Sequence, residues 1–96
     1  MIKGKTEAGF EFEVNENIGK DFRLVKATKK IKSSDTLNKL EGMYDYVEAI
    51  LGSDGVDTMM AFATEKKGYA DTEFVLDQCN EILAIVAGKS EEIKKS

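Results

Sequence analysis

The chain of 96 residues contains no histidine, no proline and no tryptophan, and its only cysteine is Cys79. Without histidine it lacks the commonest general base and the commonest metal ligand of proteins. It has no glycine-rich phosphate-binding loop, and Asn15, Asn17 and Gly19 supply only the beginning of a calcium loop. We therefore expect no catalytic residue, no cofactor and no metal site, and a buried, unreactive thiol at Cys79.

Long apolar runs are also missing, so we expect no membrane partner, and residues 1–20 contain no hydrophobic core of a signal peptide. A single cysteine cannot form a disulfide within the chain, which favours the reducing cytoplasm. The net charge of −4 and the pI of about 4.9 disfavour nucleic acid and anionic membranes as default partners. The apolar fraction of 42% and the length fit one soluble domain with a single core.

What the chain does contain is a clear strand near its start. In the segment FEFEV, apolar and acidic residues alternate, so Phe10, Phe12 and Val14 share one face. The residues before it form a second candidate strand, and Gly9 suits the turn between them because glycine readily takes positive φ. Since a lone hairpin is only marginally stable in water, we expect the hairpin of residues 1–14 to cover one side of a helical core.

The rest of the chain has the pattern of helices. Apolar residues spaced by three and four, with capping residues before them and Gly52 or Gly88 after them, predict helices over residues 21–32, 34–51, 55–67 and 71–87. The first of these also fits a twisted strand, and its lysines and arginine favour the helix. The expected fold is α+β, mainly α, with the N-terminal hairpin packed on a small bundle of about four helices. We expect a single domain over residues 1–88 and a polar, flexible tail over 89–96.

Each of the last three helices has a stripe that we assign to the core. The stripes are Leu37, Leu40, Tyr44, Val47 and Leu51 in the helix over 34–51, Val56, Met59, Met60 and Ala63 in the next, and Val75, Cys79, Ile82, Leu83 and Val86 in the last. The last helix has a second stripe with Phe74 and Ile85. It is therefore either central in the bundle or exposes one stripe to a partner.

Four apolar or aromatic side chains lie off the core stripes, namely Tyr46, Phe62, Phe74 and Ile85. Exposed aromatic residues and adaptable methionines suit a surface that binds an extended or helical partner. We therefore predict a partner-binding surface made of Tyr46, Met59, Phe62, Phe74 and Ile85. Burial in the core is the competing interpretation, which is favoured for the methionine and about equally good for Tyr46 and Phe62.

A basic segment over residues 20–32 stands out in this acidic chain, because it holds five lysines and one arginine with Phe22 among them. Such a strip is compatible with a small nucleic-acid-binding regulator. The last helix carries four carboxylates and no basic residue between Asp71 and Glu81. We therefore favour pairing of the basic segment with an acidic element, within the chain or across a homo-oligomer contact.

The order of these segments is informative as a whole. An F-x-F-x-V strand is followed by a D-F-x-L-V segment, a helix ending at LGSDG, and the acidic helix DTEFVLDQCNEILAIVAG before a lysine-rich end. Over roughly residues 8–95 the chain resembles the small tail-assembly chaperones of long-tailed phages and prophages of Gram-positive bacteria. The resemblance implies a non-enzymatic, self-associating protein that coats the long, largely helical tape-measure protein and keeps it soluble until tail-tube subunits replace it. It also implies action in the cytoplasm of the bacterial host, absence from the mature virion and, in many relatives, a longer form made by ribosomal frameshifting.

Overall fold

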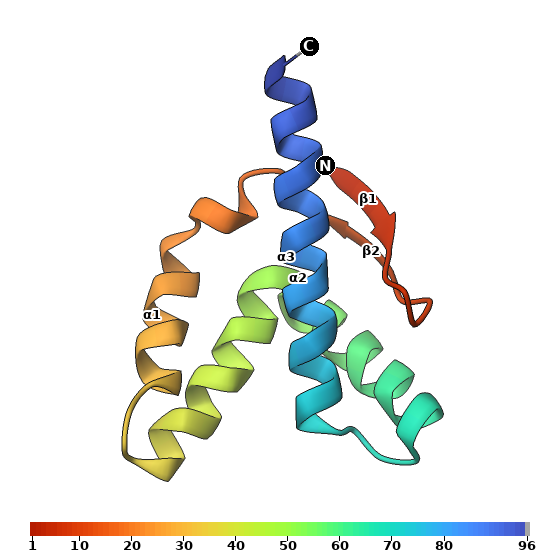
Figure 1. Ribbon diagram of the computed structural model, residues 1–96. Coiled ribbons are helices and arrows are strands. Elements are labelled where there is room, and N and C mark those ends of the chain that lie inside the picture. The colour runs from red at the N-terminus through yellow and green to blue at the C-terminus, as the bar shows by residue number, and fades with distance from the viewer. Residues whose placement is uncertain (96) are drawn as a thin grey trace.

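A computed structural model describes the backbone of residues 1–95 and the side chains of residues 1–89. Its elements are strands β1 (Ile2–Lys5) and β2 (Glu11–Val14), the short 3-10 helix η1 (Ile18–Lys20), and helices α1 (Phe22–Ile31), α2 (Thr36–Lys67) and α3 (Thr72–Lys95). Figure 1 shows α3 crossing the two diverging halves of α2, with α1 on one side and the hairpin on the other. The predicted class, α+β and mainly α with an N-terminal hairpin, is confirmed. The predicted four helices become three because α2 joins two of them.

The hairpin forms as predicted. β1 and β2 pair in an antiparallel register that places Gly4 opposite Phe12, and Gly9 takes a φ of 104° in the turn. A Cβ atom at Gly4 would lie 2.5 Å from the Phe12 ring, so the ring lies directly over this glycine. Phe10, Phe12 and Val14 are 5%, 6% and 3% exposed. The prediction that FEFEV covers a helical core is therefore confirmed.

Segment 21–32 is a helix, which decides between the two structures that the sequence allowed. The Asp21 side chain caps it by accepting a hydrogen bond of 2.9 Å from the Arg23 backbone N–H. Leu24 and Ala27 are buried. A Cβ atom at Gly42 of α2 would lie 2.9 Å from the Ala27 carbonyl oxygen, so a glycine is needed where α1 and α2 come closest.

Charge pairing joins the same two helices. The Lys30 ammonium group lies 2.6 Å from a Glu41 carboxylate oxygen and 3.0 Å from one of Asp45. Hydrogen bonds to Glu41 and then to Asp45 raise the pKa of Lys30. The expected pairing of the basic segment with an acidic element thus occurs within the chain, and these carboxylates belong to α2 rather than to the acidic last helix.

α2 bends sharply at Gly52, where φ is 77° and ψ is 168° inside an otherwise helical segment. The predicted break at this glycine is confirmed, and the helix resumes directly after it. The Asp35 side chain caps the start of α2 by accepting from the Leu37 N–H at 3.0 Å, and Gly68 ends the helix with a φ of 85°. The bend lets the two halves of α2 approach α3 from different directions (Figure 1).

α3 is longer than predicted. The Asp71 side chain accepts a hydrogen bond of 3.1 Å from the Phe74 N–H at its start, and the helix continues through Gly88 to Lys95. Gly88 does not have a positive φ, so the predicted helix end at this glycine was wrong. A glycine inside a helix costs only about 1 kcal/mol relative to alanine, which its neighbours can offset. The flexibility predicted for residues 89–96 stays a prediction, because the side chains of residues 90–96 lie outside the described part.

The core lies where α3 meets the other elements, and its largest fully enclosed side chains are Met59, Cys79 and Ile82. The hairpin covers the second stripe of α3. The Glu7 N–H donates to a Glu81 carboxylate oxygen at 2.6 Å, and the Lys89 ammonium group donates to the Lys3 carbonyl at 2.6 Å. Of the two alternatives for the two-striped helix, a central place in the bundle is therefore correct.

Candidate functional site: an apolar groove between α2 and α3

The most exposed apolar side chains of α2 are residues that the sequence assigned to the core. Leu37, Leu40, Tyr44 and Met60 are 76%, 55%, 52% and 42% exposed. The first half of α2 already packs on two sides. On one side the small residues Gly42 and Ala49 are buried, and Gly42 lies against α1. On the other side Val47 and Ile50 belong to the core. The stripe that begins at Leu37 is left open.

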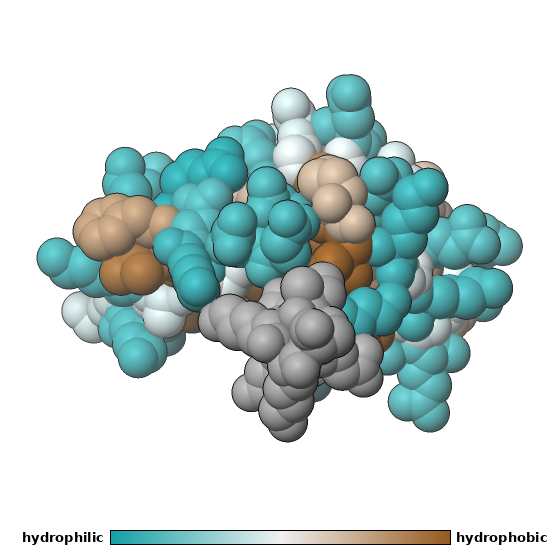
Figure 2. Space-filling view, turned by 90° about the horizontal axis from the view of Figure 1, so that it is seen from above, coloured by the Kyte–Doolittle hydropathy of each residue, from teal (hydrophilic) through white to brown (hydrophobic). Residues whose placement is uncertain are grey.

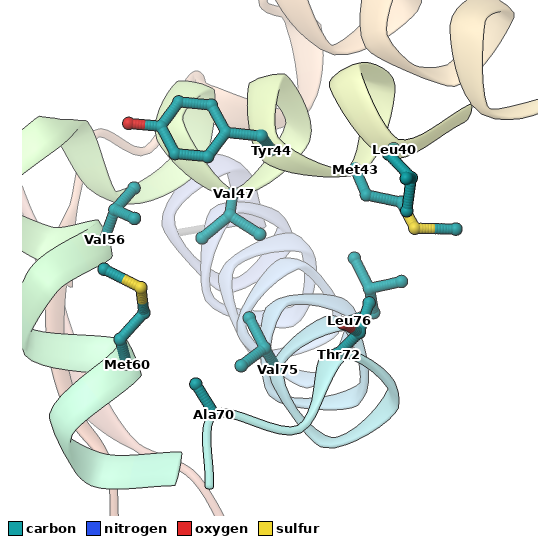
Figure 3. A pocket seen from close by; sticks show the side chains of 10 residues that line it. All are labelled: Leu40, Met43, Tyr44, Val47, Val56, Met60, Ala70, Thr72, Val75 and Leu76. Atoms are coloured by element: carbon teal, nitrogen blue, oxygen red, sulfur yellow. The ribbon is translucent and has the colours of Figure 1, made fainter. Parts of the chain in front are cut away.

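This open stripe forms one wall of a groove of about 200 Å³. The second half of α2 supplies another wall, and the start of α3 with the residues before it supplies the third (Figure 3). The lining residues are Leu40, Met43, Tyr44, Val47, Val56, Met60, Ala70, Thr72, Val75 and Leu76. Side chains from all three segments point toward the same space (Figure 3), and only Tyr44 and Thr72 bring a polar group to it.

Carboxylates lie near the Tyr44 side of the groove. The pKa of Tyr44 is raised, and the largest cause is the charge of Glu48. Burial, a hydrogen bond with Glu48 and the charges of Asp57 and Asp45 act in the same direction. The Tyr44 hydroxyl therefore lies among acidic groups from both halves of α2. At the other end of the groove, the Tyr69 hydroxyl donates to an Asp71 carboxylate oxygen at 3.1 Å.

The structure places the predicted partner surface elsewhere than in this groove. Met59 has no exposed surface and is part of the core, so the structure does not present it to a partner. The Tyr46 hydroxyl donates to the Asn80 side-chain oxygen at 2.8 Å. Tyr46 and Ile85 pack, partly buried, against the core. Their assumed position off the core faces was wrong.

Phe62 and Phe74 form an aromatic stack under the hairpin. The Phe62 ring contacts Phe10 edge-on, with centroids 5.2 Å apart, and stacks on Phe74 at 6.0 Å. The Lys66 and Lys67 ammonium groups each lie 5.5 Å from the centroid of one of these rings, Phe62 and Phe74 respectively. Phe62 thus joins the hairpin to α2, and Phe74 joins α3 to the same stack.

Sequence reasoning missed the groove although a signal for it was present. Gly42 and Ala49 are two small residues seven positions apart, so they lie on one face of a helix. Small residues on one face allow a neighbouring helix to approach closely, and in this structure α1 does so at Gly42. Taking this face as the packed one would have left the Leu37–Leu40–Tyr44 side as the open one.

The single cysteine, Cys79, is buried. Burial raises the pKa of the Cys79 thiol to about 12, which keeps it protonated and unreactive. Among those residues, no group of three or more cysteine, aspartate or glutamate side chains is placed to hold a metal ion. Of the helices described, none combines the length and apolar character needed to cross a lipid bilayer.

Comparison of the chain with protein-family models, with curated proteins and with solved structures found no match. The features that bear on function are therefore the groove and the order of the segments in the sequence.

Proposed function

We propose that this protein is a non-catalytic tail-assembly chaperone, which binds a tape-measure protein and keeps it soluble while a phage tail is built. The observation that carries the proposal is the apolar groove, whose residues Leu40, Tyr44 and Met60 are about half exposed. Covering exposed apolar surface of this kind with a partner lowers the free energy, which favours binding. The groove volume of about 200 Å³ is below the range of about 300–1,000 Å³ typical of small-molecule sites. A side-chain face of a protein therefore suits it better than a free ligand.

A helix is the partner shape that the groove favours. Its walls are helices, and an amphipathic helix can place side chains at positions i, i+3 and i+4 into such a groove. The resemblance of the sequence supplies the identity of that helix, because tape-measure proteins are long and largely helical. Binding covers apolar stripes that would otherwise aggregate, and the step needs no covalent chemistry. The same resemblance supports self-association, action in the host cytoplasm and absence from the mature virion.

Co-expression tests the proposal directly. The chain is produced with the large coiled-coil protein encoded just downstream, and the soluble fraction is purified and sized. We expect a soluble complex that is lost without this chain. The double substitution Leu40→Asn with Met60→Asn, on opposite walls of the groove, should abolish the complex. The control is Phe22→Asn with Val25→Asn, which replaces two apolar side chains of α1 that are 77% and 58% exposed. A partner that stays insoluble in the presence of the wild-type chain contradicts the proposal.

A second candidate function rests on the outer face of α1. Figure 2 shows a mainly hydrophilic surface on which a hydrophobic area stands out on the side of α1. Phe22 and Val25 are highly exposed there, and Lys26 and Lys29 of the same helix are also exposed. Lysines around an exposed aromatic ring suit the binding of single-stranded nucleic acid. If the protein is a small nucleic-acid-binding regulator, its affinity for RNA or DNA should fall steeply as the salt concentration rises. Failure to bind RNA or DNA at low ionic strength would exclude this function.

A further inference from the structure

We infer that the groove selects a positively charged partner, namely an amphipathic helix whose apolar face is flanked by lysine or arginine. The inference deepens the proposed function by naming the chemistry of the partner. It rests on the proposed function only because both use the same groove. Its basis is the distribution of charge around the groove. The two segments that supply its walls, residues 40–60 and 70–80, contain eight carboxylates and no lysine or arginine.

Acidic residues occur in each segment that supplies a wall. They are Glu41, Asp45 and Glu48 in the first half of α2, Asp54 and Asp57 in the second half, and Asp71, Glu73 and Asp77 at the start of α3. Lys39 is the only basic residue next to a lining residue in the sequence. The lysines at the end of α2 lie over the Phe62 and Phe74 rings, which are not part of the lining. A partner in the groove therefore meets an excess of negative charge at its edges.

The chain itself contains one example of the proposed preference. Lys30 of α1 reaches two of these carboxylates, Glu41 and Asp45, at 2.6 and 3.0 Å. α1 thus neutralises the outer side of the first half of α2. The charges of Glu48 and Asp57 act on Tyr44, which places both near the groove mouth. Glu48 also faces Arg23 of α1. In the described part of the chain, no basic residue forms an ion pair with Asp57 or with Glu73, which is exposed beside the lining residue Thr72. A basic residue on each flank of a bound helix would complete the same pairing there.

Charge also decides between partners with the same apolar face. An acidic helix would bring like charges together at the groove mouth, which raises the cost of binding, whereas a basic helix would be attracted and guided into position. Each exposed ion pair is worth up to about fivefold in affinity. Three such pairs, each at the middle of that range, amount to about tenfold.

Two fluorescently labelled helical peptides test the inference. Both carry leucines at positions i, i+3, i+4 and i+7, and the flanking positions are lysine in one and glutamate in the other. Anisotropy titrations with the full chain measure their affinities at low and high salt. We expect the lysine peptide to bind about tenfold more tightly at low salt, and the difference to shrink as salt screens the charges.

Paired variants assign the effect to the groove. Asp57→Asn with Glu73→Gln should weaken binding of the lysine peptide about fivefold, because two carboxylates are neutralised at the groove. The control, Glu13→Gln with Glu65→Gln, removes the same charge from two exposed residues that are not among the lining residues or their neighbours, and should change the affinity less than about twofold. Leu40→Asn with Met60→Asn should abolish binding of both peptides.

Three results overturn the inference, each in a different way. Equal affinities for the two peptides, both lost in the Leu40→Asn and Met60→Asn variant, would mean that the groove binds helices without regard to charge. The proposed function would then stand without this selectivity. In a second outcome, no peptide binds and the wild-type chain forms oligomers. If these oligomers dissociate both in the Leu40→Asn and Met60→Asn variant and in the Phe22→Asn and Val25→Asn variant, α1 of a second copy occupies the groove. Absence of binding to either peptide also overturns the inference, while co-expression decides the proposed function independently.

Discussion

Replacing Gly52 by alanine tests why α2 bends. At φ 77° and ψ 168° the backbone is in a region that is essentially restricted to glycine. A Cβ atom placed there meets no other atom within 4 Å, so crowding contributes nothing and the whole penalty is conformational. Such a conformation costs about 1–3 kcal/mol for a residue with a side chain. The reduced freedom of alanine in the unfolded chain offsets about 0.4–1 kcal/mol of this.

We therefore expect Gly52→Ala to lower the free energy of unfolding by about 1–2 kcal/mol, which corresponds to roughly 4–16 °C in Tm for a chain of this size. Urea titration followed by circular dichroism measures the change. The matched control is Gly88→Ala, because Gly88 lies within α3, also has open space around it and does not have positive φ. This control should stabilise the protein by about 0.5–1 kcal/mol. If Gly52→Ala is as stable as the wild type, the backbone argument for the bend is wrong.

Three further predictions concern the rest of the fold. Gly42→Ala should destabilise the protein by about 1–3 kcal/mol in the same titration, because its Cβ would lie 2.8 Å from the Ile31 amide nitrogen; a neutral result would show that α1 can move away freely. The Cys79 thiol should resist alkylation at pH 8 until denaturant is added, since burial raises its pKa to about 12, and rapid labelling of the native protein would contradict its burial. Hydrogen bonds from the Arg23 side chain and then its backbone lower the pKa of Asp21 from 3.8 to about 2. The stability that this carboxylate adds is therefore present above about pH 4 and lost as the pH falls toward 2. Asp21→Asn should remove that part of the acid sensitivity, and urea midpoints as steep in pH as those of the wild type would refute this.

Features controlled by local backbone chemistry were predictable from the sequence. The alternation in FEFEV, the turn at Gly9 and the break at Gly52 each follow from the preferences of a few neighbouring residues, and all three occur in the structure. Gly88 shows the limit of such rules. Its neighbours continue the helix, because a glycine ends a helix only where the chain needs the left-handed conformation.

The open side of α2 was not predictable from apolar spacing alone. Leu40 and Tyr44 have the spacing of a core stripe, but which stripe is covered depends on where α1 and α3 approach. Those approaches are long-range contacts that periodicity does not encode. The same limitation applies to Phe62 and Phe74, whose partners in the core include Phe10 of the distant hairpin. A helical wheel shows which side chains share a face, and only the tertiary fold decides which face is left for a partner.

The contact between the two ends of the chain has a consequence for its synthesis. The hairpin is made first, yet the hydrogen bonds that anchor it run from Glu7 to Glu81 and from Lys89 to Lys3. At about 5–20 residues per second, a ribosome needs roughly 4–15 seconds to extend the chain from Val14 to Lys89. During that interval a hairpin can form within microseconds, but α2 is the only long helix that can cover part of it, through contacts such as that of Phe62 with Phe10. The two hydrogen bonds that anchor the hairpin to α3 can therefore form only after α3 has been made.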